Sequence, residues 1–163
     1  GGAAAAAAAA GAEVCHVDAA KGMVLWAKEN LQLSGLGERP VRYITDDAFK
    51  FVQREQRRGN TYDGIIMDPP SYGRGTGGEV WKLEEGLFPF VRLCTSILSK
   101  KPLFFLINSY TTGLSPAVLR NLLELTIKRR FGGRIVTGEI GLPITRSRLV
   151  LPAGILGRWE ASR

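Results

Sequence analysis

Short apolar segments alternate with longer amphipathic segments along this chain. The short segments are rich in Val, Ile, Leu and Phe, which favours β-strands, whereas the longer ones repeat apolar residues near the helical spacing. The expected strands are residues 13–18, 41–45, 64–67, 103–107, 134–140 and 150–158. The expected helices are residues 3–10, 21–33, 48–58, 79–98 and 115–130. The side chains expected to face inward on the second and third helices are Val24, Leu25, Ala27, Leu31, Phe49, Phe51 and Val52.

This order of strands and helices predicts one α/β domain with a doubly wound, Rossmann-like sheet. The sheet is expected to be mostly parallel, with an antiparallel strand near the C-terminus, and residues 64–67 are expected to be buried on both faces. The alanines of residues 3–10 predict a helix that Gly11 ends. A strand and a glycine-rich turn precede the first helix of such a fold, so we interpret Gly1 and Gly2 as the end of that turn. Without its first strand, the sheet should have a central gap.

Composition and charge exclude several classes of protein. A chain of 163 residues with 45% hydrophobic residues is neither globally disordered nor collagen-like. One histidine, His16, and two cysteines, Cys15 and Cys94, cannot form a disulfide framework or a four-ligand zinc site, and we expect no metal. No segment is apolar enough to span a membrane. The net charge of +7 favours a polyanionic partner. The basic clusters are Arg54–Arg57–Arg58, Lys128–Arg129–Arg130–Arg134 and Arg146–Arg148.

Candidate binding residues follow the ends of the first two expected strands, where ligands bind in doubly wound sheets. Gly1 and Gly2 allow a cofactor to approach the backbone, and the following helix N-terminus offers free N–H groups. Asp18 can accept hydrogen bonds from both hydroxyls of a ribose, as in NAD and adenosylmethionine enzymes, or it can form an Asx-turn. Residues 46–48, Asp-Asp-Ala, can contact an adenine amine and ring nitrogen, or they can cap the next helix.

The segment Asp68-Pro69-Pro70-Ser71-Tyr72 carries the most specific pattern. Its two prolines fix the backbone and remove two N–H donors, so that carbonyl groups stand beside a carboxylate and an aromatic ring follows. Acceptors next to a stacking ring suit an exocyclic amine on a flat nucleic-acid base. A rigid turn with a packed tyrosine is the structural alternative.

At these motifs the chain resembles the class I S-adenosylmethionine-dependent methyltransferases, in which an Asp/Asn-Pro-Pro-aromatic motif ends the fourth strand. More narrowly, it looks like the bacterial family related to the large-subunit ribosomal RNA methyltransferases that make 5-methylcytosine or N2-methylguanine. The segments that carry the resemblance are VCHVDAAK (14–21), WAKEN (26–30), DDAFKF (46–51), YDGIIMDPPSYGRG (62–75), GEVWKLEE (78–85) and LPAGILGRW (151–159).

The resemblance implies a methyltransferase catalytic domain over residues 1–163, incomplete at its N-terminus, with S-adenosylmethionine as cofactor and RNA as partner. The cofactor-binding residues would be Gly1, Gly2, Asp18, Asp46, Asp47, Ala48 and Asp68. The catalytic residues would be Asp68, Pro69, Pro70 and Tyr72. The substrate-side residues would be Ser71, Arg74, Lys82 and Asn108, with residues 73–78 and the helix start at residues 79–82 bordering the substrate entrance.

The absence of a cysteine at one position indicates the type of reaction. Methylation of cytosine C5 needs a cysteine nucleophile, which in the resembling enzymes follows the fifth strand. Residues Asn108-Ser109-Tyr110 stand there instead, so we favour methylation of an exocyclic amine. In that reaction Asp68 and the Pro69 carbonyl would hold the amine, Tyr72 would stack on the base and Asn108 would help to orient it.

Three other functions remain open from the sequence. A methyltransferase acting on a small molecule or a protein would share the fold, and so would a non-catalytic domain that binds adenosylmethionine or RNA. An NAD-dependent oxidoreductase would share the glycines and Asp18 but would not need the Asp-Pro-Pro-Tyr pattern. We expect a cytoplasmic protein; the pattern indicates no oligomeric state.

Overall fold

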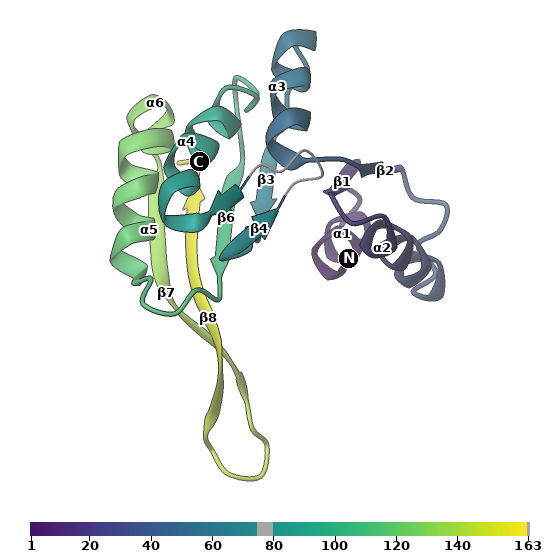
Figure 1. Cartoon of the computed structure of the whole chain (residues 1–163). Coiled ribbons are helices and arrows are strands. Elements are labelled where there is room, and N and C mark those ends of the chain that lie inside the picture. Colours follow the sequence, from purple (N-terminus) through teal and green to yellow (C-terminus); the bar gives the residue numbers. More distant parts are fainter. Residues whose placement is uncertain (75–79, 163) are drawn as a thin grey trace. The chain divides into compact units, whose positions relative to one another are not determined.

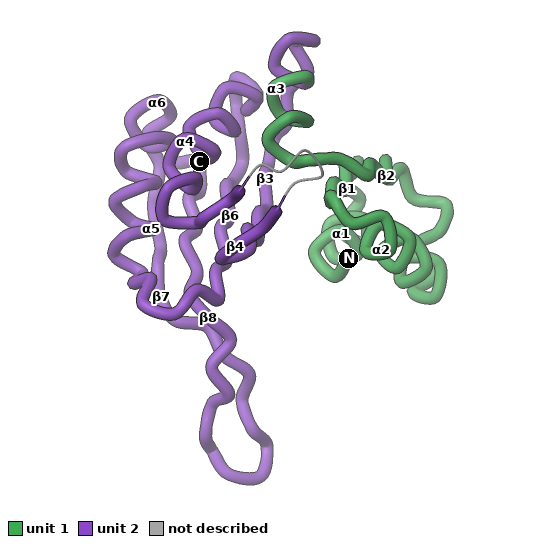
Figure 2. The backbone as a smooth tube through the Cα atoms, in the orientation of Figure 1, with its two compact units in different colours: residues 1–54 green, residues 55–163 purple. Residues whose placement is uncertain are grey.

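The computed structural model describes residues 1–74 and 80–162 of the chain. These residues form two compact units, Gly1–Arg54 and Glu55–Arg163, which are coloured green and purple in Figure 2. Helix α3 (Ala48–Arg58) runs through the boundary between them. Each unit contains one pair of parallel strands, and each is described by itself below.

Unit 1 is a two-stranded parallel sheet with two helices. Strands β1 (Val14–Asp18) and β2 (Val41–Thr45) pair in register from Val14 beside Val41 to Asp18 beside Thr45. Helix α2 (Lys21–Leu33) connects them, and helix α1 (Gly2–Ala9) precedes them. This parallel connection through a helix is the βαβ unit that the sequence predicts.

The core of unit 1 is built around the alanine helix. Ala4 and Ala8 of α1 are buried with Leu31 of α2, and Val14 and Val41 pack against this cluster. Alanine side chains allow α1 to lie close to the strands, and the prediction of a closely packed helix is confirmed. Gly11 follows with a φ of 89°, a left-handed conformation that suits the end of a helix.

Unit 2 contains a four-stranded sheet in the order β3-β6-β8-β7. Its strands are β3 (Gly64–Met67), β6 (Phe104–Ser109), β7 (Arg134–Pro143) and β8 (Val150–Glu160). Strand β3 is parallel to β6, while β8 is antiparallel to both β6 and β7. The α/β fold with one antiparallel strand near the C-terminus is therefore confirmed.

The described strands do not form one continuous sheet. Among the residues that the structure describes, β1 pairs only with β2, and β3 pairs only with β6, so each has one open edge.

Helices in unit 2 pack on the sheet and bury its aromatic residues. Trp159 and Phe105 are inaccessible to solvent, as are Leu119 and Leu123 of the helix that covers them. Gly157 lies directly beneath that helix, because a Cβ atom there would come within 2.9 Å of Leu119. The helical elements of unit 2 after α3 are α4 (Leu83–Thr95), α5 (Pro116–Leu123), a π-helical turn η1 (Glu124–Lys128) and α6 (Arg129–Phe131).

Some expectations about local structure are wrong. Residues 80–82 do not continue a helix: strand β5 (Val80–Lys82) pairs with β4 (Tyr72–Arg74) in an antiparallel hairpin, and α4 begins only at Leu83. Residues 75–79, which include most of the expected glycine-rich loop, lie outside the described residues. Leu25 and Phe49 are exposed although helical spacing suggested inward positions, and Ile66 of β3 is 41% exposed.

A long hairpin arm extends from the sheet of unit 2. Strands β7 and β8 continue past the point where β8 leaves β6, and residues 141–152 are all exposed (Figure 1). Because Ser109 at the end of β6 lies beside Ile155, the arm leaves from the carboxyl edge of the parallel pair β3–β6. In the part of the chain that the structure describes, no helix is both long and apolar enough to cross a membrane.

Candidate functional site

Two aspartates meet at the carboxyl edge of unit 1. Asp18 is the last residue of β1, and Asp46 directly follows β2. The backbone N–H of Asp46 donates to the carbonyl of Asp18 at 3.0 Å, so the two strand ends are joined. The structure thus brings together two of the acidic residues that the sequence singles out.

One of the two oxygens of the Asp18 carboxylate is hydrogen-bonded within its own turn. Its Oδ1 accepts a hydrogen bond from the N–H of Ala20 at 2.7 Å, which is the Asx-turn considered above. Among the described residues, no other hydrogen bond to this carboxylate is formed. The second oxygen therefore keeps its capacity to accept hydrogen bonds from a ligand.

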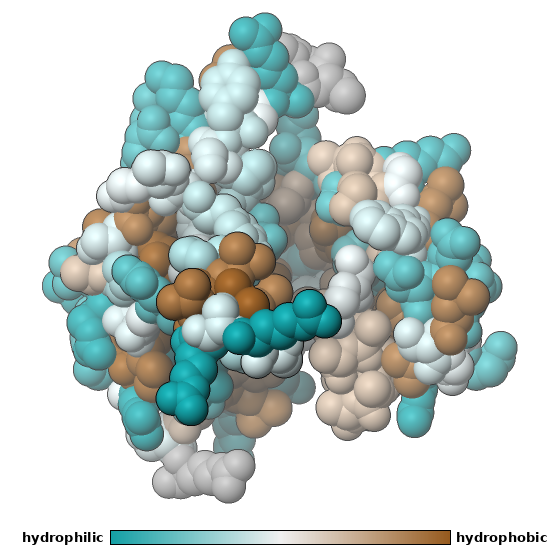
Figure 3. Space-filling view, turned by 90° about the horizontal axis from the view of Figure 1, so that it is seen from below, coloured by the Kyte–Doolittle hydropathy of each residue, from teal (hydrophilic) through white to brown (hydrophobic). Residues whose placement is uncertain are grey.

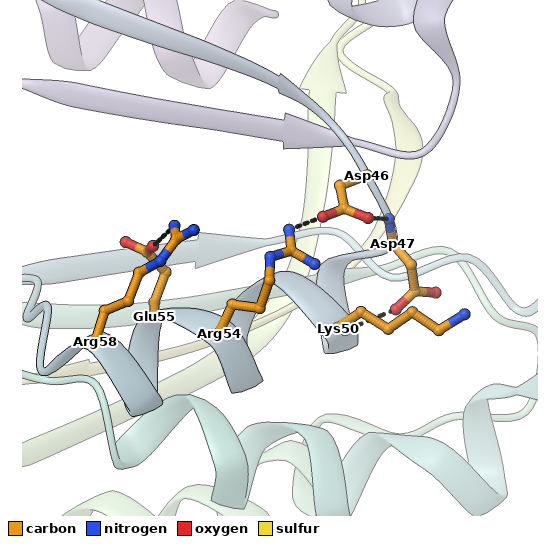
Figure 4. A network of polar contacts seen from close by, with 6 residues as sticks. All are labelled: Asp46, Asp47, Lys50, Arg54, Glu55 and Arg58. Carbon is orange, nitrogen blue, oxygen red and sulfur yellow. Dashed lines mark hydrogen bonds and ion pairs between the residues drawn. The ribbon is translucent and has the colours of Figure 1, made fainter.

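Asp46 and Asp47 have different local partners, which Figure 4 shows. Asp46 forms an ion pair with Arg54 through one oxygen and accepts from the N–H of Asp47 at 2.9 Å through the other. Asp47 accepts from the N–H of Lys50 at 2.8 Å and so caps the start of α3. Asp46 is thereby occupied on both oxygens, whereas Asp47 and the N–H of Ala48 keep free hydrogen-bonding capacity among the described residues.

The two N-terminal glycines lie at the start of α1. Gly1 is the N-cap of this helix and Gly2 is its first residue, so unpaired N–H groups of the first turn are available there. A Cβ atom on Gly1 would come within 2.7 Å of Ala27 in α2. Only glycine at position 1 therefore allows the turn to pack closely against α2.

Asp68 holds the corresponding position in unit 2. It follows β3, whose last residue, Met67, lies beside Ile107 of β6, so Asp68 is level with Asn108 at the carboxyl edge. Neighbouring protein atoms partly desolvate the carboxyl group and raise its pKa above the ordinary value, although the residue as a whole is exposed. Among the described residues no group donates a hydrogen bond to it.

The prolines explain why Asp68 has no local partner. Asp18 is captured by the N–H two residues further on, at Ala20. The residue two positions after Asp68 is Pro70, and the next residue is Pro69, neither of which has an N–H. The Asx-turn that forms at Asp18 therefore cannot form at Asp68, and its carboxylate stays available.

Three hydrogen bonds hold the loop that follows Asp68. The indole N–H of Trp81 donates to the carbonyl of Pro70 at 2.7 Å, and the N–H of Leu83 donates to the carbonyl of Ser71 at 3.0 Å. The hydroxyls of Ser71 and Thr111 lie 2.8 Å apart. The loop is thus tied to the β5–α4 junction on one side and to the loop after β6 on the other.

Sequence reasoning missed two residues of this network, Thr111 and Ser109, and included Trp81 only as part of a helix start beside the substrate entrance. Thr111 also contacts Ser109, whose buried hydroxyl accepts from the Thr111 N–H at 3.2 Å. The hydroxyl residues at the end of an apolar strand were a usable signal, since polar groups there lie at the ligand-binding edge. No local pattern indicates that Trp81 reaches back to Pro70.

The other expected substrate-side residues lie around the same edge. Tyr72 is 52% exposed, and its hydroxyl accepts from the Arg74 side chain at 2.9 Å. Lys82 lies beside Tyr72 across the β4–β5 hairpin and pairs with Glu85 at 2.9 Å. The side-chain carbonyl of Asn108 is buried without a hydrogen-bond partner among the described residues. The structure therefore gathers Asp68, Pro69, Pro70, Ser71, Tyr72, Arg74, Lys82 and Asn108 in unit 2.

The cysteines and the histidine lie elsewhere. Cys94 is buried within α4, and burial raises the pKa of its thiol to about 12. Cys15 is partly buried in the middle of β1. Burial lowers the pKa of His16, its neighbour in β1. In residues 1–74 and 80–162, no three His, Cys, Asp or Glu side chains gather as a metal site requires.

Comparison with known proteins places this geometry in context. No family model matches the chain. The crystal structure of the SAM-dependent methyltransferase from Agrobacterium tumefaciens matches 96% of the chain with a TM-score of 0.87 and 45% sequence identity. This chain resembles the class I S-adenosylmethionine-dependent methyltransferases. An O-methyltransferase from Bacillus cereus in complex with SAH shares the fold at 13% identity, with a TM-score of 0.52 over 92% of this chain and 63% of that one.

Similarity in sequence points to the methyltransferases of ribosomal RNA. The ribosomal RNA large subunit methyltransferase I of Cronobacter sakazakii is 34% identical over 60 residues, which make up 37% of this chain. That match covers 15% of the curated relative, and the chain spans 51% of the solved methyltransferase from Agrobacterium tumefaciens. The resemblance to class I methyltransferases related to large-subunit ribosomal RNA enzymes is confirmed.

Proposed function

We propose that residues 1–163 are part of the catalytic domain of an S-adenosylmethionine-dependent methyltransferase that methylates an exocyclic amine on a base of RNA, with ribosomal RNA as the leading substrate. One observation carries the choice of reaction. Asp68 presents a carboxylate without a local partner at the carboxyl edge of a parallel strand pair, in a loop that three hydrogen bonds hold in place.

The residues of unit 1 fit the adenosine part of the cofactor. The free oxygen of Asp18 would accept hydrogen bonds from the ribose hydroxyls. The free oxygen of Asp47 would accept from the adenine amine, and the N–H of Ala48 would donate to a ring nitrogen. Asp46, with Arg54, would hold this loop. Gly1 and Gly2 would leave room for the methionine part beside the first N–H groups of α1.

S-adenosylmethionine supplies an electrophilic methyl group when it is bound. The chain must then orient the acceptor nitrogen, bind its protons and exclude water. Asp68 and the Pro69 carbonyl, which has no hydrogen-bond donor among the described residues, would accept the N–H groups of the amine. Tyr72 would stack on the base, and the unpartnered carbonyl of Asn108 would receive a further donor.

The proton balance assigns a second role to Asp68. Transfer of the methyl group from the sulfonium of bound S-adenosylmethionine to the amine nitrogen would require one N–H proton of the amine to leave. The Asp68 carboxylate would take up this proton. Its raised pKa makes Asp68 a stronger base than an aspartate with the ordinary pKa.

The cysteines argue against methylation of cytosine C5. That reaction needs a thiolate that attacks C6 of the base. Cys94 is buried with a pKa of about 12, so almost no thiolate is present near neutral pH. Cys15 lies inside β1, three residues before the carboxyl end of the strand. Ser109 and Asn108 occupy the end of β6, where the resembling cytosine enzymes carry their cysteine.

RNA as substrate is supported by charge and by the named relatives. The chain carries a net charge of +7, and polyanion binding depends on such an excess. The curated relatives act on large-subunit ribosomal RNA by name. An RNA substrate and a cytoplasmic location are both parts of this proposal.

The decisive experiment uses the intact gene product. Calorimetric titration should show binding of S-adenosylmethionine and no binding of NAD. Incubation with labelled S-adenosylmethionine and unmodified ribosomal RNA should transfer the label, and mass spectrometry of the digested RNA should find it on an exocyclic nitrogen.

Three outcomes would contradict the proposal. Label on carbon C5 of cytosine would overturn the amine reaction. Cofactor binding with transfer only to small molecules or proteins would overturn the substrate. Binding of RNA and cofactor without any transfer would indicate a non-catalytic binding domain.

A further inference from the structure

A basic hollow lies between α4 and the π-helical turn η1 in unit 2. Its volume is about 330 Å³, and its lining includes two arginines, two threonines and one aromatic residue. No acidic residue lines it in the part of the chain that the structure describes. Arginine is always charged, so the hollow holds two positive charges and polar hydroxyls. These five lining residues are Arg92, Arg129, Thr95, Thr126 and Phe88.

The two arginines of the hollow have no partner among the described residues. Arg92 and Arg129 are exposed, and neither side chain forms a hydrogen bond or an ion pair there. Their basic neighbours are engaged: Lys128 pairs with Glu124 at 2.7 Å, and Arg130 donates to a carbonyl of α4 at 2.9 Å. The positive charges in the hollow are therefore uncompensated and open to an anion.

Capping of α4 does not explain Arg92. Cations near the C-terminus of a helix often hydrogen-bond its last carbonyl groups, but here those groups have other donors. The Arg92 carbonyl accepts from the hydroxyl of Thr95 at 2.6 Å. The carbonyl of Leu93 accepts from the hydroxyl of Ser96 at 2.7 Å, and that of Thr95 accepts from Arg130. The Arg92 guanidinium group is therefore left for another acceptor.

The other lining residues suit a nucleotide. Phe88 is 44% exposed, and an accessible aromatic ring beside arginines is the combination on which single-stranded nucleic acids bind. The hydroxyls of Thr95 and Thr126 each donate to a backbone carbonyl. Their protons are thus used, but their oxygens keep lone pairs that can accept from a ribose hydroxyl.

The backbone on one side of the hollow has an uncommon form. Residues Glu124–Lys128 form the π-helical turn, and within it the Thr126 hydroxyl donates to the carbonyl of Leu122 at 2.7 Å. Such local bonds compete with regular helix geometry. Because π-helical turns are rare and frequently occur at functional sites, this turn is a second observation that points to a ligand here.

The hollow is separated from the Asp68 loop by the length of α4. Leu83, the first residue of α4, donates to the Ser71 carbonyl of that loop. Arg92 lies about 14 Å further along the helix, at 1.5 Å per residue. The arm leaves unit 2 at its other end, which Figure 3 shows from below. A single nucleotide at the Asp68 loop could not reach the hollow, whereas a polynucleotide could.

We propose that the hollow between α4 and η1 binds a nucleotide of the RNA strand away from the methylated base. Arg92 and Arg129 would hold its phosphate, and Phe88 would stack on its base. This inference rests on RNA as the substrate in the proposed function. It concerns affinity for RNA alone, so it does not depend on which atom is methylated.

The test is the affinity of the full-length protein for RNA, measured by fluorescence anisotropy with a labelled transcript of large-subunit ribosomal RNA at several salt concentrations. Arg92→Gln and Arg129→Gln should each raise the Kd about fivefold or more and reduce the salt slope of binding by about one, because one phosphate contact is lost. Phe88→Leu should raise the Kd without changing the salt slope, because stacking on a base releases no counterions.

Arg39→Gln is the matched control. Arg39 is exposed in unit 1, outside the hollow, and its side chain has no ion pair among the described residues. The substitution removes the same charge, and it should leave the affinity for RNA nearly unchanged because salt screens distant charges. Thermal melting of each variant checks that the fold is retained. The same melting assay with added inorganic phosphate or a mononucleotide tests for a small phosphate ligand.

Two results would overturn this inference and leave the proposed function intact. In the first, the wild type binds and methylates RNA, and the variants of Arg92 and Arg129 lose no more affinity than Arg39→Gln. In the second, a mononucleotide or inorganic phosphate raises the melting temperature of the wild type but not of Arg92→Gln, while RNA affinity is the same in both; the hollow would then bind a small phosphate compound. A wild type that binds no RNA would overturn both this inference and the RNA substrate of the proposed function.

Discussion

The acidic residues at the carboxyl edges of the two units differ in their partners. In unit 1, Asp18, Asp46 and Asp47 each accept at least one hydrogen bond from a nearby backbone N–H. In unit 2, Asp68 accepts none among the described residues. The difference lies in the following two residues, which are alanines after Asp18 and prolines after Asp68. The available backbone donors thus separate carboxylates that are fixed by hydrogen bonds from one that has no such hydrogen bond.

The largest effect is expected for Asp68→Ala. Loss of a general base that also orients the acceptor should reduce the rate of methyl transfer by about 10²- to 10⁴-fold. Cofactor affinity should stay within about twofold, because unit 1 supplies the adenosine contacts. Rates from a labelled-methyl assay and a calorimetric dissociation constant measure the two effects. Full activity in the variant would exclude the role of Asp68.

Asp18→Ala should affect cofactor binding and not the rate of methyl transfer. Removing a charged acceptor of ribose hydroxyls should weaken cofactor binding by about 1.5–3 kcal/mol, roughly 10- to 150-fold. At saturating cofactor the rate of transfer should be nearly unchanged. Asp46→Asn is the matched control, since Asp46 is occupied by Arg54 and Asp47. If both variants bind the cofactor equally well, the assignment of the ribose to Asp18 is wrong.

Pro70→Ala tests directly why Asp18 accepts a backbone hydrogen bond and Asp68 does not. The substitution restores an N–H two residues after Asp68, in the position from which Ala20 captures Asp18. We expect about tenfold slower transfer and a lower pKa for Asp68, because a hydrogen bond to the carboxylate stabilises the charged form.

The sign of the pH dependence follows from the same pKa. In the wild type, partial burial raises the pKa of Asp68, so activity should fall as the pH decreases through that raised value. In Pro70→Ala the acid limb should move to lower pH. Profiles of kcat/KM against pH would show this shift of the acid limb. If Pro70→Ala changes neither the acid limb nor the rate, the new N–H does not form a hydrogen bond with the Asp68 carboxylate.

The smallest effect is expected for the ion pair of Asp46. Its side chains are about one quarter to one third exposed, and such pairs contribute about 0.5–1 kcal/mol. Arg54→Gln should lower the free energy of unfolding by that amount in denaturant titrations, and the loss should shrink in high salt. A loss of several kcal/mol would mean that Arg54 does more than hold the Asp46 loop.

Local patterns were sufficient for much of the fold. The strands at residues 41–45 and 64–67 and the helices at 21–33 and 48–58 lie where apolar spacing predicts them. Residues 80–82 were misassigned because their pattern suits a helix, while pairing with Tyr72–Arg74 makes them a strand. Pairing with the neighbouring strand overrides the local preference for a helix.

The candidate site was predictable to a similar degree. Strand-end acids such as Asp18 and Asp68 can be identified from their place in the strand–helix pattern. The contact of Trp81 with the Pro70 carbonyl and that of Thr111 with Ser71 could not, because each joins segments that meet only through the tertiary fold.

The buried thiol of Cys94 makes this chain a convenient host for site-specific probes. With a pKa of about 12, almost none of this buried thiol is ionised at pH 8, so maleimide reagents should not modify it. Cys15→Ala would remove the other native thiol. A dye or spin label attached after Ser147→Cys, at the tip of the arm, would then report distances and mobility from that point alone.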